Sequence, residues 1–62
     1  DNLGGSFKQG DWVRLKSGPF KSFEGEVVMT LRDGDVRMYA VHLSFRSVEI
    51  VHTIDCLSIE GA

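Results

Sequence analysis

Apolar and polar residues alternate over short stretches of this chain, and glycine-containing breaks separate the stretches. Alternation with a period of two, interrupted by Gly, Pro or Asp-Gly pairs, is typical of short β-strands joined by turns. No stretch has the apolar spacing of an amphipathic helix of useful length. The pattern predicts strands at residues 11–16, 24–30, 36–43 and 47–53, with a short fifth element that holds Leu57 and Ile59.

Two of the breaks have the chemistry of tight turns. Ser17, Gly18 and Pro19 separate the first two predicted strands, and the Asp-Gly pair at residues 33–34 is the strongest short hairpin signal in the chain. A lone glycine, Gly25, lies inside the second predicted strand, where it permits a bend or a close approach of another backbone.

Five short strands without a crossover helix predict an all-β fold. We expect a strongly bent, five-stranded antiparallel sheet that closes into a small barrel, because closure hides the sheet edges and encloses a core. Alternation along each strand assigns one face to that core. The predicted core residues are Val13, Leu15, Val27, Met29 or Val28, Tyr39, Val41, Leu43, Val48, Ile50 and Leu57.

Length and composition are those of one small folded domain. The chain has 62 residues, of which 26% are charged and 42% hydrophobic. We expect residues 7–62 to form the domain and the glycine-rich residues 1–6 to be a linker or a cloning remnant. No apolar run approaches the roughly 18 residues that a membrane-spanning helix needs. The net charge of −2 favours a protein partner over nonspecific binding to nucleic acid.

Residues with catalytic or metal-binding chemistry are present without the spacing that such sites need. His42, His52, Asp55 and Cys56 do not form the paired Cys or His pattern of a zinc site, and no nucleophile elbow surrounds a serine. A single cysteine cannot form an internal disulfide, which fits a reducing compartment. The sequence therefore predicts a binding module without enzymatic activity, metal or cofactor.

Residues 10–28, GDWVRLKSGPFKSFEGEVV, resemble the KOW motif of the NusG family of transcription elongation factors, and the resemblance extends more weakly over residues 7–60. It implies an SH3-like β-barrel. Eleven positions fit the family pattern: Gly10, Asp11, Val13, Arg14, Leu15, Gly18, Pro19, Phe20, Phe23, Gly25 and Val27.

The chain has more aromatic rings than so small a core must bury, so some are expected to face water. These rings are Phe7, Trp12, Phe20, Phe23, Tyr39 and Phe45. One interpretation is that Phe20 and Phe23 plug the open end of the barrel. The other, implied by the resemblance, is a partner-binding patch made of Phe20, Phe23, Phe45 and Arg46.

The resemblance also implies partners and a setting. NusG-type domains of this kind bind the ribosomal protein NusE or a termination factor, while an N-terminal domain, absent from this chain, holds RNA polymerase. The expected state is a monomer without membrane contact, in the bacterial cytoplasm or in a plastid.

Residues 45–50 differ from the corresponding F-G-R-x-T-P-V-E-L stretch of the general NusG factor, because they lack its glycine and proline. Residues 49–54 look more like RfaH, a specialised paralog whose C-terminal domain can switch between a helical hairpin and a β-barrel. Gly18, Pro19, Gly25 and Gly34 oppose long helices, so the barrel is the expected form.

A second function class is RNA binding, because KOW domains also occur in ribosomal proteins. The candidates for an RNA-binding surface are Lys8, Arg14, Lys16 and Lys21. The alternative for these four residues is the ordinary solvated face of a strand, which nine acidic against seven basic residues favour.

Overall fold

Five antiparallel strands and one short 3₁₀ turn make up the computed structural model, which describes residues 7–62. The all-β prediction is confirmed. The predicted linker, residues 1–6, lies outside the described residues. The elements are β1 (Trp12–Leu15), β2 (Glu24–Asp33), β3 (Val36–Phe45), β4 (Val48–Asp55), η1 (Cys56–Ser58) and β5 (Ile59–Gly61).

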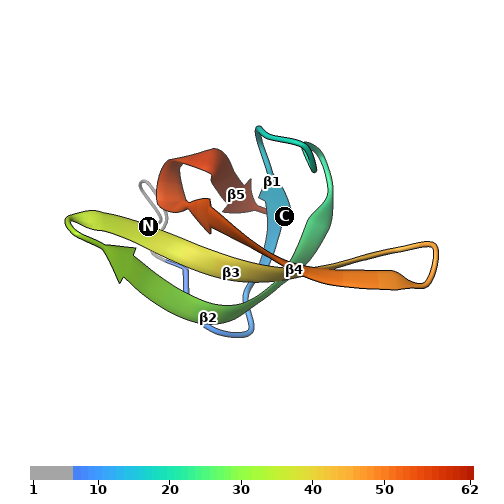
Figure 1. Cartoon of the computed structure of the whole chain (residues 1–62), viewed down its shortest axis with the longest axis horizontal. Helices are drawn as coiled ribbons and strands as arrows, with labels where there is room; N and C mark the ends of the chain where they lie inside the picture. Colours follow the sequence, from blue (N-terminus) through green and yellow to red (C-terminus); the bar gives the residue numbers. More distant parts are fainter. Residues whose placement is uncertain (1–6) are drawn as a thin grey trace.

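The strands form one strongly bent sheet in the order β4-β3-β2-β1-β5 (Figure 1). The start of β2 pairs with β1, and most of its length pairs with β3. Within the described residues β4 and β5 are the two ends of the sheet, and η1 leads directly from one to the other. The barrel is therefore curved around a core but is not closed by strand pairing.

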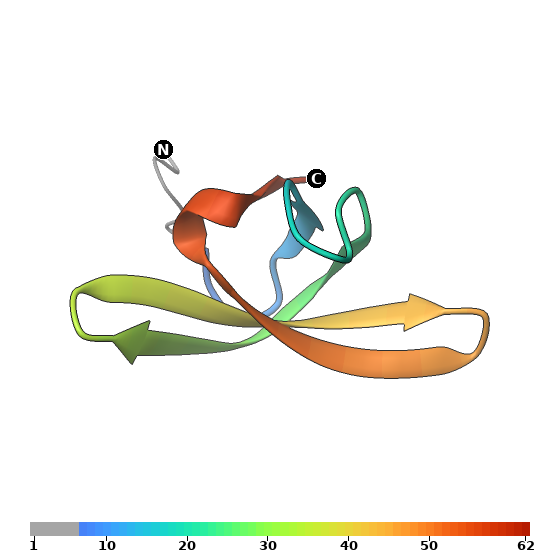
Figure 2. The same ribbon diagram turned by 45° about the horizontal axis from the view of Figure 1, so that its top comes forward.

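Tight two-residue turns join the three long strands. The predicted hairpin at Asp33-Gly34 is confirmed, with Asp33 opposite Val36 and Gly34 at a φ of 61°. The next hairpin pairs Phe45 with Val48, so β3 extends two residues beyond its predicted end. β4 begins one residue after its predicted start and continues two residues beyond its predicted end, to Asp55. Figure 2 shows these two hairpins pointing in opposite directions from the centre of the molecule.

Two features bend β2 around the core. Gly25 pairs with Val13 of β1, and a Cβ atom there would collide with the main-chain carbonyl oxygen of His42 on β3. A bulge between Val27 and Met29 then shifts the register against β3. These irregularities let one strand take part in both halves of the sheet.

The core lies on the concave face of this sheet. The prediction is confirmed for the six most deeply buried large side chains, which are Val13, Leu15, Val27, Tyr39, Val41 and Leu43. Phe7, Ala40, Ile54 and Ile59 are also buried and were not predicted as core. Ile50 is half-buried and packs against the core, as expected.

Three predicted core residues are exposed. Val48 is 62% exposed because the β3–β4 hairpin carries it past the end of the core. Leu57 is 71% exposed because it lies in η1, where strand alternation does not apply. Met29 is 54% exposed because the bulge at Val28 turns it to the convex face, opposite Ala40. The alternative residue, Val28, is half-buried.

Candidate partner-binding site

Residues 16–23 form the loop between β1 and β2, and this loop lies over the base of the β3–β4 hairpin (Figure 2). Between the loop and the hairpin is a cavity of about 260 Å³ with an entirely apolar lining. We call it the aromatic groove. It is lined by Phe20, Phe23, Leu43, Phe45, Val48 and Ile50.

Three phenylalanines form a continuous row along the groove. The ring centroids of Phe20 and Phe23 are 5.9 Å apart, and those of Phe23 and Phe45 are 5.4 Å apart. Phe20 also meets the ring of His52 on β4 at 5.0 Å. These separations are within the range for favourable aromatic contact, so the rings stabilise one another's positions.

The rings of the groove differ in burial. Phe20 and Phe23 are half-buried and pack against the core, whereas Phe45 is 54% exposed. Phe20 and Phe23 therefore cover an end of the core and also line the groove. The two interpretations made from the sequence, a plug of the barrel and a partner-binding patch, are thus compatible. The expectation that some rings face water is confirmed by Phe45 and by Trp12, which is 55% exposed.

Local backbone geometry presents Phe20 and Phe23 on one side of the loop. Gly18 has a φ of 87°, and its carbonyl accepts a hydrogen bond from the Lys21 N–H at 3.2 Å. The Phe20 carbonyl accepts from the Phe23 N–H at 3.0 Å in the next turn. Main-chain bonds between Leu15 and residues 22 and 23 then fasten the loop to the end of β1.

Arg46 lies at the tip of the β3–β4 hairpin, beside the groove. Its guanidinium carbon is 5.1 Å from the centroid of the Phe45 ring, which is a cation–π distance. Arg46 and Ser47 both have positive φ, at 52° and 69°. Two positive φ values in a two-residue loop are the pattern of a type I′ turn, so this tip is well defined without glycine.

All four residues predicted for a partner patch thus lie together, in or beside the groove. Leu43, Val48 and Ile50 were not predicted as part of the site, because alternation assigned them to the core. One signal in the sequence could have identified them. Alternation along β3 and β4 continues to the hairpin tip, so it places these side chains on the same face as Phe45.

Two of the four basic residues predicted to bind RNA form ion pairs within the domain. Arg14 binds two carboxylates, Glu24 at 2.7 Å and Glu60 at 3.2 Å. Lys8 lies 3.8 Å from a carboxylate oxygen of Asp11. Lys16 and Lys21 are exposed at the start of the β1–β2 loop and within it.

The ion pairs of Arg14 change the protonation equilibria of this cluster. Hydrogen bonds to Glu24 and then Glu60 raise the pKa of Arg14 above its usual value. Hydrogen bonds from Arg14 and from the Trp12 indole lower the pKa of Glu24. The charge of Arg14 is thus largely balanced, which makes it a poor contact for a phosphate backbone.

Chemistry for a metal or a membrane is not evident in the part of the chain that the structure describes. Residues 7–62 contain no group of three His, Cys, Asp or Glu side chains arranged to hold a metal ion. They also contain no helix long and apolar enough to cross a membrane. Cys56 is half-buried and packs against the core.

Comparison with protein families matches residues 9–43 to the model of the KOW motif. The matched segment covers more than half of the 62-residue chain and runs from three residues before β1 to Leu43, near the end of β3. Comparisons with curated proteins and with solved structures found no match.

Proposed function

Since this chain belongs to the KOW motif family, whose members are small non-catalytic modules that bind RNA or protein, we propose that it is the protein-interaction module of a NusG-like transcription elongation or antitermination factor. The aromatic groove is the observation that supports protein binding. It is the binding surface in this proposal.

The chemistry of the groove suits a hydrophobic anchor from a partner protein. Its lining is apolar, and the 54% exposed ring of Phe45 forms one wall beside the charged tip residue Arg46. Aromatic and arginine side chains around a small desolvated pocket dominate the binding energy of many protein interfaces. An aliphatic or aromatic side chain of the partner would fill this space.

The edge of the sheet offers a second means of attachment next to the groove. β4 is the last strand of the sheet in the described residues, and its residues Val48 and Ile50 line the groove. An extended segment of a partner can pair with such an edge through main-chain hydrogen bonds while its side chains enter the adjacent pocket. This combination gives affinity through the backbone and selectivity through the rings.

In this proposal the partner is the ribosomal protein NusE or a termination factor, recruited to the elongating RNA polymerase in the bacterial cytoplasm or a plastid. An N-terminal domain outside this chain would hold the polymerase, and a flexible linker would keep the recruited protein at high effective concentration. The module itself acts as a monomer.

The hairpin tip favours a specialised, RfaH-like paralog within this proposal. The two-residue loop Arg46-Ser47 replaces the longer glycine-containing tip of the general factor and places a guanidinium directly over a groove ring. A different tip beside the same groove is a simple way to change which partner is preferred.

The test is calorimetric titration of NusE into the domain and its Phe45→Ala variant, followed by the Phe20→Ala and Phe45→Ala double variant. Phe45 is exposed, so its removal leaves the core intact, and the loss of a central anchor should weaken binding by about 30-fold or more. The double variant should abolish measurable binding.

Trp12→Ala is the matched control, because Trp12 is equally exposed and lies outside the groove. Its affinity for NusE should equal that of the wild type, and circular dichroism should show strands in every variant. Unchanged affinity in the double variant, or an equal loss in Trp12→Ala, would contradict the proposal.

A further inference from the structure

The convex face of the three long strands has no covering element in the part of the chain that the structure describes. Figure 2 shows β1, β5, η1 and the β1–β2 loop on the opposite side of β2, β3 and β4. An apolar sheet face is normally buried against a helix or a second sheet, because burial removes its side chains from water. The side chains of this face therefore indicate what kind of partner it fits.

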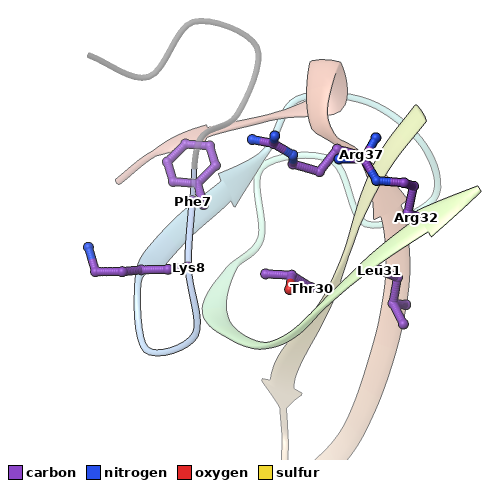
Figure 3. Close-up of a pocket in the computed structure, with 6 residues that line it drawn as sticks. All are labelled: Phe7, Lys8, Thr30, Leu31, Arg32 and Arg37. Carbon is purple, nitrogen blue, oxygen red and sulfur yellow. The ribbon is translucent and has the colours of Figure 1, made fainter. Parts of the chain in front are cut away.

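Alternation and register place an apolar cluster on the convex face. Met29 of β2 is opposite Ala40 of β3, and Leu31 is opposite Met38. In Figure 3 the side chains of Leu31 and Arg32 point to opposite sides of β2, as the alternation requires. We call the cluster the convex patch. It consists of Met29, Leu31, Val36, Met38, Ala40 and Val51.

The convex patch is largely accessible to a partner. Met29 and Val51 are more than half exposed, and Leu31 and Val36 are also exposed. Four of the eight large hydrophobic side chains that are exposed within residues 7–62 therefore belong to this one patch. Ala40 lies among them and is buried, so the larger side chains beside it form a continuous apolar surface over the backbone.

Carboxylates surround the patch, and alternation puts no lysine or arginine of the described strands on this face of β2, β3 or β4. Arg32 and Arg37 are on the concave side, next to Thr30 and Tyr39 in the register. Asp33 is opposite Val36 and Asp55 is opposite Met38, while Glu26 and Glu49 lie toward the other end of the patch. The four surrounding carboxylates are Glu26, Asp33, Glu49 and Asp55.

The contacts of these carboxylates leave the face acidic. Glu49 contacts the His42 ring at 2.9 Å, and Asp55 accepts a hydrogen bond from the Leu57 N–H at 2.9 Å. None of the four carboxylates forms an ion pair with a lysine or arginine of residues 7–62. Two copies of the domain placed face to face would bring these like charges together, and an anionic surface would be repelled.

We propose that the convex patch binds an amphipathic helix of a partner protein, with an apolar stripe flanked by lysine and arginine. The apolar stripe would pack on Met29, Leu31 and Met38, and the basic side chains would reach the surrounding carboxylates. Methionine side chains are unbranched and adapt to the shape of a bound helix. This surface is separate from the aromatic groove, so the proposal does not depend on the binding of NusE.

The dimensions of the patch suit a helix. Residues 36–42 of β3 span about 20 Å at roughly 3.3 Å per residue, which is the length of a helix of about 14 residues. Three strands spaced about 4.8 Å apart are about 10 Å wide, close to the diameter of a helix with its side chains. An extended segment would cover only part of this width.

The experiment measures binding of a fluorescein-labelled helical peptide by anisotropy. The peptide has about 14 residues, with leucines spaced three and four positions apart and lysines elsewhere. Met29→Gln should weaken its binding about fivefold through the loss of apolar contact, and Glu26→Gln should weaken it about twofold. Leu57→Gln is the matched control, because Leu57 is exposed in η1 and lies outside the patch, and its affinity should equal that of the wild type.

A second peptide, with glutamate in place of lysine, tests the charge of the partner and should bind at least tenfold more weakly. Amide chemical shifts with the lysine peptide should be largest in residues 29–31, 36–40 and 51–53, and Phe45→Ala should bind this peptide as the wild type does. Equal losses in Met29→Gln and Leu57→Gln, equal affinity for both peptides, or shifts centred on residues 16–23 would overturn the proposal. Self-association of the domain that Met29→Gln abolishes would overturn it as well, because a second copy would then be the occupant.

Discussion

At the scale of single residues, Gly25 has the most demanding position in the sheet. It pairs with Val13 on one side, and on the other side the carbonyl oxygen of His42 occupies the place where its Cβ would be. The Leu43 side chain is 2.9 Å from the same position, so two neighbours would have to move. No side chain can be accommodated without shifting the backbone of β3.

Gly25→Ala should therefore lower the free energy of unfolding by about 3 kcal/mol, the upper part of the usual range for overpacking. Urea denaturation monitored by circular dichroism measures this change. Gly61→Ala is the control, since its nearest neighbour, the Phe7 ring, is 3.8 Å away at ordinary contact distance. If Gly25→Ala lost no more stability than Gly61→Ala, the close approach of the His42 carbonyl would not be what requires glycine at this position.

Arg46 and Ser47 have a left-handed backbone that residues other than glycine rarely adopt. Such a conformation persists only when its surroundings impose it, and here the two-residue length of the hairpin does so. In return, Arg46 is held over the Phe45 ring instead of projecting freely into solvent. The unfavourable backbone conformation of the tip thus fixes the position of Arg46 beside the aromatic groove.

At the scale of strands, Arg14 connects three elements. From β1 it reaches Glu24 on β2 and Glu60 on β5, and Glu24 also accepts a hydrogen bond from the Trp12 indole at 3.2 Å. β5 has only three residues, so this side-chain connection supplements a short ladder of main-chain hydrogen bonds.

The lowered pKa of Glu24 makes this connection dependent on pH. Because its pKa in the folded state is below the ordinary value of 4.5, the contribution of Glu24 to stability is fully present above pH 4.5 and is lost as the pH falls through the lowered value. Wild type should melt at a higher temperature than Glu24→Gln at pH 7, and the two melting temperatures should converge below pH 4.5.

Melting curves recorded by circular dichroism between pH 7 and pH 3 test this pH dependence. Arg14→Gln should show the same convergence, because it removes the other side of the ion pair, and high salt should shrink the difference since the groups are exposed. A difference that stays constant over the whole pH range would show that the carboxylate of Glu24 is not responsible.

The sequence was sufficient to predict the strands and their turns, because alternation and the Asp-Gly pair are local signals. It was not sufficient for the exposed residues Met29, Val48 and Leu57, which depend on a bulge, a hairpin extension and a 3₁₀ turn. The bulge and the hairpin extension arise from pairing with other strands, which a single strand's pattern does not contain. The 3₁₀ turn is capped by the Asp55 side chain, which accepts a hydrogen bond from the Leu57 N–H at 2.9 Å, and it interrupts the alternation.

The candidate partner-binding site shows the same limit. The residues of the partner patch came from a family motif, whereas their contacts with Val48 and Ile50 required the fold of the hairpin. Arg32 and Arg37 are likewise five positions apart in the sequence and become neighbours only through the β2–β3 register. Pairing register, which the sequence leaves open, decides which side chains lie together.

At the scale of the whole molecule, the concave face of the sheet has different chemistry at its two ends. The aromatic groove lies at the β3–β4 hairpin, and a second, open pocket, lined in part by Lys8, Arg32 and Arg37, lies beside the β2–β3 hairpin, which points the opposite way (Figure 2). The buried residues Tyr39, Val41 and Leu43 of β3 fill the space between them. A partner bound in the aromatic groove would therefore leave the β2–β3 end of the sheet uncovered.

Substitution at the β2–β3 end should consequently leave the affinity at the aromatic groove unchanged within about twofold, since rigid sites without a shared moving element have little coupling free energy. Calorimetric titration of NusE into Arg32→Gln should give the affinity seen with the wild type, whereas Phe45→Ala should reduce it. A loss of NusE affinity in Arg32→Gln as large as that in Phe45→Ala would show that the two ends form one surface, and docking at the groove alone would then be wrong.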